Sequence, residues 1–415
     1  MVTILGLGFV GLTTALGLSH LGYKVYGFDV NKERVETLKS GKIPFFEPHM
    51  EEVLQAHLNK NFFIVDDLKA ALKDSEIIFY CVGTPYGKDG SADLKYLFSA
   101  LDMTFDAIND ENFRVLTIKS TIPPSTTSEK IIPYLNDKLS EKLRKNYAIA
   151  NNPEFLREGH CWEDFINADR IVIGCDDYRA REKLIKLYAP LNVPIKCVTP
   201  STGEFIKYLS NTLLATLISY SNEMAQAADI IGNIDVAEAF KIIHMDKRWN
   251  GCNMTTYLYP GCGYGGYCLP KDTNAFLAQI KAKGFESPIL KNVIATNDKR
   301  PAIIAKKIVG NLDKKSGIGI LGLSFKPLSD DVRDTPAFRI IQEILKAGYK
   351  NIFAYDPVAN SNFVKNYSEL PIKILDSARE VYELSKVVAI VTAWDEFRKV
   401  PTFGNKKIVD CRYML

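Results

Sequence analysis

A glycine-rich loop ends in a cysteine that has the surroundings of a nucleophile. Residues 261–266 contain four glycines, and Cys268, Lys271 and Asp272 follow directly. The Lys271 ammonium and a helix expected to begin near Thr273 both favour the thiolate form of Cys268, which is the nucleophilic form. An arbitrary cysteine is more often buried filler, but this combination favours covalent chemistry at Cys268.

A second glycine pattern, Gly6-x-Gly8-x-x-Gly11, follows an expected strand and opens an expected helix. In that setting the glycines let backbone N–H groups approach a pyrophosphate, and the helix N-terminus adds partial positive charge. Asp29 ends the next strand, 23 residues after Gly6, where dinucleotide-binding folds place a ribose-binding carboxylate. A carboxylate there repels a 2′-phosphate, which favours NAD over NADP, although Arg34 lies nearby. The alternative is a glycine-rich turn that binds nothing.

Two further polar patterns fit such chemistry without deciding it. Lys207 and Asn211 are four residues apart in a segment expected to be helical, so they share one helix face. The loop at residues 152–159 carries Glu154 and Glu158 directly after an expected strand, and these carboxylates suit water activation or binding of sugar hydroxyls. Taken alone, the helical pair is more typical of an ordinary exposed surface, and the loop is not decisive.

The composition is that of an ordinary globular protein and excludes several classes. The chain has 415 residues, of which 47% are hydrophobic and 24% charged, and its formal net charge is +3. These values exclude a disordered, collagen-like or coiled-coil chain and give no electrostatic reason to expect nucleic acid or a membrane surface as partner. No apolar run reaches the roughly 18 residues of a membrane span, and no signal peptide is recognised, so we expect a cytoplasmic protein. The eight cysteines include no CxxC pair, so no metal site is expected.

The order of the expected elements predicts an α/β protein with two Rossmann-like, doubly wound parallel-sheet domains joined by a long central helix. Short apolar runs alternate with helical patterns in the N-terminal part, as in βαβ units, and again near the C-terminus. The central helix is expected from Thr202 to Ile231, with Ser201 and Glu204 forming a capping box at its start. Three domains are expected, at residues 1–200, 201–300 and 301–415.

The C-terminal domain repeats the N-terminal nucleotide-binding pattern with its glycines changed. Residues 320–325 echo residues 4–9, but Ser324 stands at the position of the second glycine, and its bulk removes the close approach to a dinucleotide. Lys326 and Arg333 make the same turn cationic, which suits a phosphate or nucleotide ligand. A solvated surface loop would have the same charge pattern.

Together these segments make the chain resemble the UDP-glucose/GDP-mannose dehydrogenase family over essentially its whole length. The glycine fingerprint alone is common, but the set of motifs in this order is highly specific. The matching motifs are GLGFVGL (6–12), CVGTP (81–85), Ser120-Thr121, NPEFLREG (152–159), EFIKYLSN (204–211), GYGGYCLPKDT (263–273) and GLSFKPLSDDVRDTP (322–336).

The resemblance implies a four-electron oxidation of the sugar C6 alcohol to a carboxylate, with two NAD⁺ and one water. Cys268 would trap the intermediate aldehyde as a thiohemiacetal, which a second hydride transfer converts to a thioester. Lys207 would stabilise alkoxide charge, with Asn211 as a hydrogen-bond donor. The remaining catalytic positions implied are Asp272 and Thr121, which orient a water, and Glu158, a base for thioester hydrolysis.

The resemblance also implies binding residues and domain roles. NAD contacts would come from Val10, Asp29, Arg34, Thr84, Thr121, Glu158, Lys271 and Arg333, beside Gly6, Gly8 and Gly11. Substrate contacts would come from Glu154, Phe155, Leu156, Arg157, Glu158, Lys207, Asn211, Tyr257, Leu258, Tyr259, Pro260, Gly261, Gly265 and Lys326. Arg248 matches an arginine that reaches a neighbouring subunit's substrate, which implies a homodimer built on the long helix. Residues 1–200 would bind NAD, 201–300 would hold the dimer contact and catalytic loop, and 301–415 would bind the UDP-sugar.

Alternatives to this interpretation remain at the level of the sequence. UDP-glucose is favoured as substrate, while GDP-mannose and UDP-N-acetylhexosamines would undergo the same chemistry. A one-step alcohol dehydrogenase would share the Rossmann half and the long helix but form no covalent adduct. A non-catalytic nucleotide-sugar sensor would bind both ligands without turnover. Tyr267 also departs from the family, because many relatives carry Ser before the cysteine.

Overall fold

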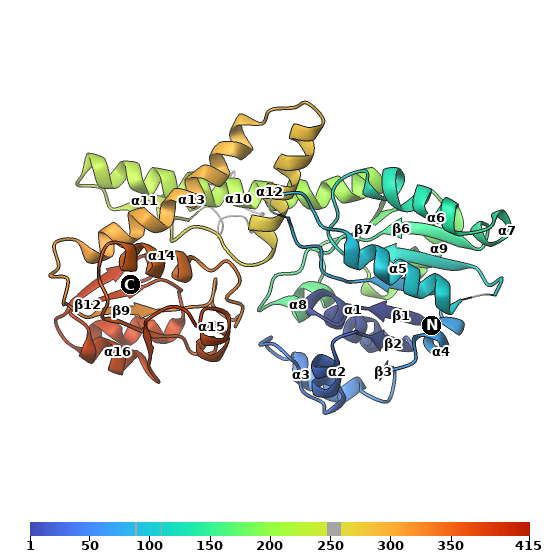
Figure 1. The fold of residues 1–415 in the computed structure, drawn as a ribbon, viewed down its shortest axis with the longest axis horizontal. Helices are drawn as coiled ribbons and strands as arrows, with labels where there is room; N and C mark the ends of the chain where they lie inside the picture. Colours follow the sequence, from blue (N-terminus) through green and yellow to red (C-terminus); the bar gives the residue numbers. More distant parts are fainter. Residues whose placement is uncertain (88, 109, 247–258) are drawn as a thin grey trace. The chain divides into compact units, whose positions relative to one another are not determined.

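The computed structural model describes residues 1–87, 89–108, 110–246 and 259–415 of the chain. Contacts divide it into two compact units, Met1–Leu209 and Ser210–Leu415. Each unit contains one open sheet with helices packed on it (Figure 1).

The first unit is built on an eight-stranded sheet in the order β3-β2-β1-β4-β5-β6-β7-β8. All neighbouring strands are parallel except β6 and β7, which pair antiparallel. The strands are β1 (Val2–Leu5), β2 (Val25–Phe28), β3 (Phe62–Ile64), β4 (Ile77–Tyr80), β5 (Arg114–Ile118), β6 (Tyr147–Asn151), β7 (Ile171–Gly174) and β8 (Ile195–Val198). The helices are α1 (Phe9–His20), α2 (Lys32–Lys39), α3 (Met50–His57), α4 (Leu68–Lys73), α5 (Lys95–Ala107), the π-helical η1 (Thr127–Ile131), α6 (Ile132–Lys138), α7 (Glu141–Arg144), α8 (Cys161–Ile166), α9 (Tyr178–Tyr188) and the 3₁₀ turn η2 (Ala189–Leu191).

Both faces of this sheet are buried, which is why its strands are apolar at consecutive positions. Ile4 and Leu5 are adjacent in β1 but belong to different hydrophobic clusters, because successive side chains of a strand point to opposite faces. Helices α1 and α3 contribute Leu12, Leu16 and Leu54 to the first cluster. The second cluster holds Leu5 with residues of α4, α5 and α6. A parallel sheet is stable only with both faces covered in this way.

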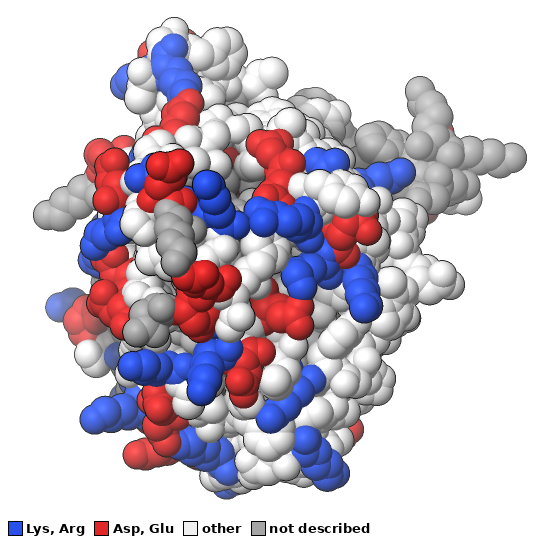
Figure 2. Space-filling view, turned by 90° about the vertical axis from the view of Figure 1, so that its right-hand side faces the viewer, with Lys and Arg blue, Asp and Glu red and all other residues white. Residues whose placement is uncertain are grey.

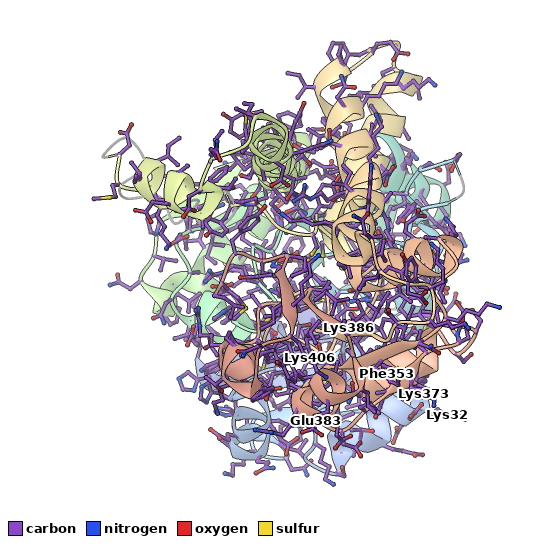
Figure 3. The ribbon with its side chains drawn as sticks, turned by 90° about the vertical axis from the view of Figure 1, so that its left-hand side faces the viewer. Lys32, Phe353, Lys373, Glu383, Lys386 and Lys406 are labelled. Atoms are coloured by element: carbon purple, nitrogen blue, oxygen red, sulfur yellow. The ribbon has the colours of Figure 1, made fainter. Side chains whose placement is uncertain are left out.

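Helix α10 (Pro200–Ile231) begins in the first unit and continues into the second. The second unit adds α11 (Val236–His244), α12 (Cys268–Ala282) and α13 (Pro288–Val309), and then a five-stranded parallel sheet in the order β11-β10-β9-β12-β13. Its elements are β9 (Ile318–Leu321), α14 (Pro336–Lys346), β10 (Ile352–Tyr355), α15 (Asn360–Asn366), β11 (Lys373–Ile374), α16 (Ala378–Leu384), β12 (Val387–Ile390), the 3₁₀ segment η5 (Asp395–Phe403) and β13 (Lys407–Asp410). Lys406 Nζ donates to the carbonyls of Tyr382 and Glu383 at the end of α16, where a cation complements the helix terminus (Figure 3).

The expected repeat of the N-terminal pattern in the C-terminal domain is confirmed by equivalent hydrogen bonds in the two sheets. Gly6 N donates to Phe28 O at 2.9 Å, and the equivalent Gly322 N donates to Tyr355 O at 2.8 Å. Each sheet places the first strand of its copy at the centre, β1 between β2 and β4 and β9 between β10 and β12. The predicted fold class, two Rossmann-like domains and a long central helix, is therefore confirmed.

Two local expectations were wrong. Helix α12 begins at Cys268 and not near Thr273, because Pro270 lies within its first turn, where a missing N–H costs nothing. The capping box at the start of α10 does not form. Thr199 Oγ1 accepts from Thr202 N at 3.3 Å, while Glu204 turns to Thr127.

The surface carries charges of both signs. On the face of the molecule drawn in Figure 2, basic and acidic side chains are interspersed. Among the described helices, none has the length and apolar character that crossing a membrane requires.

Helix α10 buries a carboxylate within its first turns. Glu204 is 3% exposed, and its Oε1 accepts from the backbone N of Thr127 at 2.8 Å and from the Thr127 hydroxyl at 2.5 Å. Burial raises the pKa of Glu204 to about 7, although the hydrogen bonds from Thr127 oppose this shift. The Glu204 carboxyl group thus fixes the start of η1, and its ionisation lowers the stability of the folded protein as the pH rises.

Replacing Glu204 with Gln should flatten part of the pH dependence of stability. The folded-state pKa of about 7 lies above the ordinary 4.5, so the group's contribution is fully present below about pH 4.5 and is lost as the pH rises to 7. In urea unfolding, the free energy of the wild type relative to Glu204→Gln should fall by about 1–2 kcal/mol between pH 5 and pH 8. Glu36→Gln, at an exposed position, is the control. A difference that does not vary with pH would contradict the raised pKa.

Candidate active site

The first glycine loop leaves a backbone cradle at the N-terminus of α1. Gly6 has φ of +89°, and a Cβ there would lie 2.7 Å from the Cys81 carbonyl oxygen. A Cβ at Gly11 would lie 1.8 Å from Gly6 O, so only glycine lets helix and strand pack this closely. At Gly8, in contrast, a Cβ would meet no atom of the described residues within 4 Å. Open space in front of backbone N–H groups fits a dinucleotide pyrophosphate.

Asp29 lies at the end of β2 beside this cradle. Its Oδ2 accepts from Leu7 N at 2.7 Å and from Arg34 Nη1 at 2.8 Å, and its side chain is 4% exposed. Arg34 is thus paired with Asp29 and does not face a 2′-phosphate alone, which fits NAD. Val10 is half-buried in the first turn of α1.

The loops after β4 and β5 are tied together at the same edge of the sheet. Thr84 Oγ1 donates to the Thr121 carbonyl at 2.7 Å, and Ser120 Oγ donates to Val82 O at 2.6 Å. The carboxyl ends of parallel strands are where this fold class binds ligands. The structure therefore brings together Thr84 and Thr121, two of the residues predicted to contact NAD.

A buried ion pair joins the loop after β6 to helix α10. Lys207 Nζ lies 2.8 Å from Glu154 Oε1, and both side chains are 6% exposed. Glu154 Oε2 accepts from Leu156 N at 2.7 Å, and the Lys207 ammonium lies 5.6 Å from the centroid of the Phe155 ring. Burial alone would raise the pKa of Glu154, but the Lys207 charge outweighs it and the pKa is lowered. The carboxylate is therefore ionised at neutral pH.

The rest of this loop turns away from the ion pair. Arg157 pairs with Asp164, with Nη2 at 2.6 Å from Oδ1, and is half exposed. Glu158 is partly buried. Burial raises the pKa of the Cys161 thiol, and the negative charges of Glu47 and Glu158 raise it further. Glu47, which the sequence did not single out, accepts from Gly159 N and Cys161 N at 2.8 Å each.

In the second unit, Asp272 is the centre of a buried polar cluster. Asp272 is fully buried, its Oδ2 accepts from Asn211 Nδ2 at 2.5 Å, and its Oδ1 pairs with the Lys271 ammonium. Burial disfavours the charged form of Lys271, but Asp272 and the Cys268 sulfur outweigh it, so the pKa of Lys271 is raised. Cys268 is partly exposed, is not in a disulfide, and begins α12 one turn before Asp272. This places a thiol, a carboxylate and a cation in one helix turn.

The remaining loop residues pack on the C-terminal sheet's first loop. Arg333 lies over the Tyr267 ring at 4.4 Å and Lys271 at 5.5 Å. A Cβ at Gly265 would lie 2.4 Å from Asp334 O, which explains the need for glycine there. Lys326 lies 5.5 Å from the ring of the preceding phenylalanine. The ring of Tyr267, the departure from the family pattern, thus contacts two cations that are predicted to bind NAD.

Three residues that the sequence analysis missed hold the glycine loop in place. Arg300 Nε donates to Gly261 O at 2.8 Å, and Asn222 Oδ1 accepts from Gly261 N at 2.6 Å. Asn297 makes two hydrogen bonds with the backbone of Tyr264, at 2.8 and 3.0 Å. Each is a polar residue at a buried helical position, which is the one signal the sequence offered.

Some predicted substrate residues cannot be placed. Arg248, Tyr257 and Leu258 lie outside the described residues. Tyr259 is described and donates to Tyr413 O at 3.2 Å, while Pro260 is buried.

Three domain models of one protein family match the chain. They are described as the UDP-glucose/GDP-mannose dehydrogenase family NAD binding domain, central domain and UDP binding domain, and match residues 1–192, 201–299 and 319–415. UDP-glucose 6-dehydrogenase of Rickettsia bellii is 36% identical over 404 residues, covering 96% of this chain and 90% of the relative. UDP-glucose 6-dehydrogenase of Rhizobium meliloti is also 36% identical, over 415 residues, with coverage of 96% and 90%.

Solved structures agree with these matches. A UDP-glucose dehydrogenase from Pyrobaculum islandicum has a TM-score of 0.91 at 33% identity and covers 99% of this chain and 94% of its own. A UDP-D-ManNAc dehydrogenase from Pyrococcus horikoshii has a TM-score of 0.85 at 27% identity, with coverage of 100% and 96%. With the dinucleotide cradle, the buried ion pairs and the cysteine helix, these matches show that the chain belongs to the UDP-glucose/GDP-mannose dehydrogenase family and is an NAD-dependent dehydrogenase of nucleotide sugars.

Proposed function

We propose that the protein oxidises UDP-glucose to UDP-glucuronate in two NAD-dependent steps through a covalent bond to Cys268. The observation that carries this proposal is the first turn of α12, where Cys268 precedes a buried Asp272 that is shared by Lys271 and Asn211. A one-step alcohol dehydrogenase has no use for a thiol beside such a cluster. The names of the relatives support UDP-glucose as the substrate.

The N-terminal residues would hold the cofactor. Gly6, Gly8 and Gly11 would receive its pyrophosphate, and Asp29 its adenosine ribose, while Arg34 orients Asp29. When bound, NAD⁺ accepts one hydride in each of two oxidation steps. Other residues proposed to contact it are Val10, Thr84, Thr121, Glu158, Lys271 and Arg333.

Lys207 would stabilise the oxygen at C6 during both oxidations. As the alcohol loses its proton and hydride, negative charge develops on this oxygen, and a desolvated ammonium stabilises that charge strongly. Glu154 holds the ammonium at 2.8 Å and so fixes its position. The amide of Asn211 already donates to Asp272, and its second N–H would donate to the substrate.

Cys268 would make the second oxidation possible. An aldehyde gives up hydride only after a nucleophile adds to its carbon, so the thiolate forms a C–S bond and the carbonyl oxygen takes a proton. Loss of the second hydride leaves a thioester. Asp272 and Thr121 would orient the water that attacks it, with Glu158 as base, and the C–S bond then breaks to release the carboxylate. In sum, one alcohol, two NAD⁺ and one water give one carboxylate, two NADH and three protons.

The division of labour follows the expected domains. We propose that residues 1–200 bind NAD, 201–300 carry the catalytic loop, and 301–415 bind the UDP-sugar. The substrate contacts would then include Gly261, Gly265 and Lys326 of the second unit, beside the loop from Glu154 to Glu158 of the first.

Stoichiometry separates the proposal from one-step oxidation. Purified protein with NAD⁺ and limiting UDP-glucose should form two NADH per sugar, because oxidation to a carboxylate removes four electrons. Absorbance at 340 nm and chromatography of the product measure both quantities. One NADH per sugar with an aldehyde product would contradict the proposal, and faster turnover of GDP-mannose or a UDP-N-acetylhexosamine would correct the substrate.

Replacing Cys268 with Ala should abolish formation of the carboxylate, by about a thousandfold or more in kcat. The thiol supplies the only covalent step, so no thioester can form. Cys197→Ala, at a partly buried site on β8, should retain activity within about twofold and serves as the matched control. Full two-step turnover by Cys268→Ala would exclude covalent catalysis at this residue.

We also propose a homodimer that uses one face of α10. An apolar stripe at Phe205, Leu209, Leu213, Tyr220 and Met224 is between 38 and 53% exposed. The spacings of four and seven residues keep these side chains on one side of the helix. A continuous exposed apolar face on a long helix is typical of a surface that a second copy covers.

Charges on the stripe should dissociate the dimer. The double variant Leu213→Glu, Tyr220→Glu should sediment as a monomer, because two carboxylates would be buried without partners. Tyr178→Glu, which changes a 70% exposed tyrosine on α9, is the control and should sediment as the wild type does. A monomeric wild type would contradict the proposed dimer, and a double variant that stays dimeric would place the interface elsewhere.

A further inference from the structure

A buried lysine lies behind the Glu154–Lys207 pair and has no role in the chemistry described above. Lys119 follows β5 and is 6% exposed. Its Nζ donates to Asn152 Oδ1 at 2.8 Å and reaches Asn152 O at 3.4 Å. Lysine is almost never buried without a carboxylate at ion-pair distance, because the charge loses its hydration. Within the described residues both hydrogen bonds of Lys119 go to Asn152. Such an arrangement is unusual for a buried lysine and calls for an explanation.

Asn152 is fixed from every side. Its Oδ1 also accepts from the Tyr188 hydroxyl at 2.6 Å, its Nδ2 donates to Val172 O at 2.8 Å, and its backbone N donates to Ile118 O at 2.9 Å. Asn152 is 1% exposed and Tyr188 is also 1% exposed. The side chain is thus clamped between β5, β7 and α9.

The clamp determines where Glu154 lies. Only Pro153 separates Asn152 from Glu154, and its ring fixes φ, so the chain between them has little freedom. Glu154 in turn holds the Lys207 ammonium at 2.8 Å. A rigid path therefore runs from Lys119 through Asn152 and Glu154 to Lys207.

The lysine also adds charge to the cluster. Charged or titratable groups face it from three elements: Cys81 after β4, Glu154 after β6 and Lys207 on α10, with Tyr188 of α9 beyond Asn152. Burial lowers the pKa of Lys119 to about 8, and the nearby Lys207 charge adds to this, while Cys81 and Glu154 oppose it. With Lys119 protonated, the cluster contains two ammonium groups and one carboxylate, which is paired with Lys207, so the cluster carries one excess positive charge. An excess positive charge in a desolvated site favours a developing oxyanion.

We propose that Lys119 is a positioning residue for the oxidation: Asn152 holds its ammonium near the Glu154–Lys207 pair, and the Lys119 charge acts on the substrate oxygen through that pair. This inference rests on the proposed function, in which Lys207 stabilises the C6 oxygen. Lys119 itself touches neither substrate nor cofactor in this account.

Three variants separate its charge from its hydrogen bond. Lys119→Met removes both, Lys119→Gln keeps a donor for Asn152 but removes the charge, and Tyr188→Phe removes the other donor while keeping the charge. Both Lys119 variants should lower kcat about tenfold, which corresponds to one pKa unit of electrostatic interaction. KM for UDP-glucose and for NAD⁺ should change less than about threefold, because ground-state contacts are untouched.

The pH profile distinguishes positioning from a merely structural role. The wild type should lose kcat as the pH rises through about 8, where Lys119 loses its charge, and this change should be absent in both Lys119 variants. Tyr188→Phe should keep the wild-type profile even where it lowers stability. A Lys119→Gln variant with wild-type kcat and profile, or a Tyr188→Phe variant that matches Lys119→Met, would overturn the inference.

A second measurement needs no turnover. Competitive acetylation followed by mass spectrometry reports the pKa of a single lysine, and the pKa of Lys207 should rise by about one unit in Lys119→Met, since a neighbouring positive charge is gone. It should not change in Tyr188→Phe. If the wild type oxidised no nucleotide sugar, the proposed function would fail while this measurement still decided the coupling. An unchanged Lys207 pKa in both Lys119 variants would disprove it.

Discussion

A carboxylate in a protein interior needs hydrogen-bond donors or a cation around it, and this constraint shapes the candidate site residues of each unit. Glu154 has Lys207 and a backbone N–H in the first unit, and Asp272 has Lys271 and Asn211 in the second. Removing one partner from such a pair would leave an uncompensated buried charge, which costs several kcal/mol. The pairs are therefore weak contributors to net stability but strong constraints on geometry.

One helix supplies a partner to each carboxylate. Lys207 and Asn211 are one turn apart on α10, on one face of a 32-residue helix that begins in the first unit and ends in the second. Another side of the same helix carries the exposed apolar stripe that we propose as the dimer contact. If α10 shifted by one residue, Lys207 and Asn211 would lose their carboxylate partners and the apolar stripe would turn to another side.

The two Rossmann sheets place an equivalent carboxylate in different surroundings. Asp29 and Asp356 occupy the same position, and each accepts from the backbone N of the leucine after its glycine, at 2.7 and 2.8 Å. Asp356, however, is saturated by its own domain through Ser324 N and Oγ, Trp394 Nε1, Val358 N and Ala359 N. These donors occupy both oxygens of Asp356 and leave none for a ribose hydroxyl. The carboxylate of Asp356 therefore has a structural role. The serine at position 324, in place of the glycine at position 8, and the occupied oxygens of Asp356 both disfavour dinucleotide binding in the second unit.

Much of this arrangement could be predicted because it is local in sequence. The strand–glycine–helix pattern, the acid 23 residues on, the long helix and the cysteine loop each fit within a short window. The start of α12 was misplaced because proline is a helix breaker in the interior but is tolerated in the first turn, where Pro270 lies. The supporting residues could not be predicted for a different reason: Glu47 acts on a loop 112 residues away and Lys119 on one 33 residues away. Such pairings are set by the order of strands in the sheet, which no short pattern encodes.

The start of α12 supports the nucleophilic role proposed for Cys268, whose neighbouring cation is paired with a carboxylate. Lys271 is paired with Asp272, whose negative charge offsets part of the Lys271 charge at the sulfur. Tyr267 at the N-cap makes no side-chain hydrogen bond to the first turn of this 15-residue helix, within the described residues. The uncapped N–H groups and the helix dipole therefore remain to favour negative charge, by roughly 0.3–1 kcal/mol and up to about 2 when partly buried. A conventional Ser, Thr or Asp cap would satisfy those N–H groups and add competing negative charge or dipole. Tyrosine at this position stacks under Arg333 instead, so it does not compete for the helix terminus with the thiolate that we propose at Cys268.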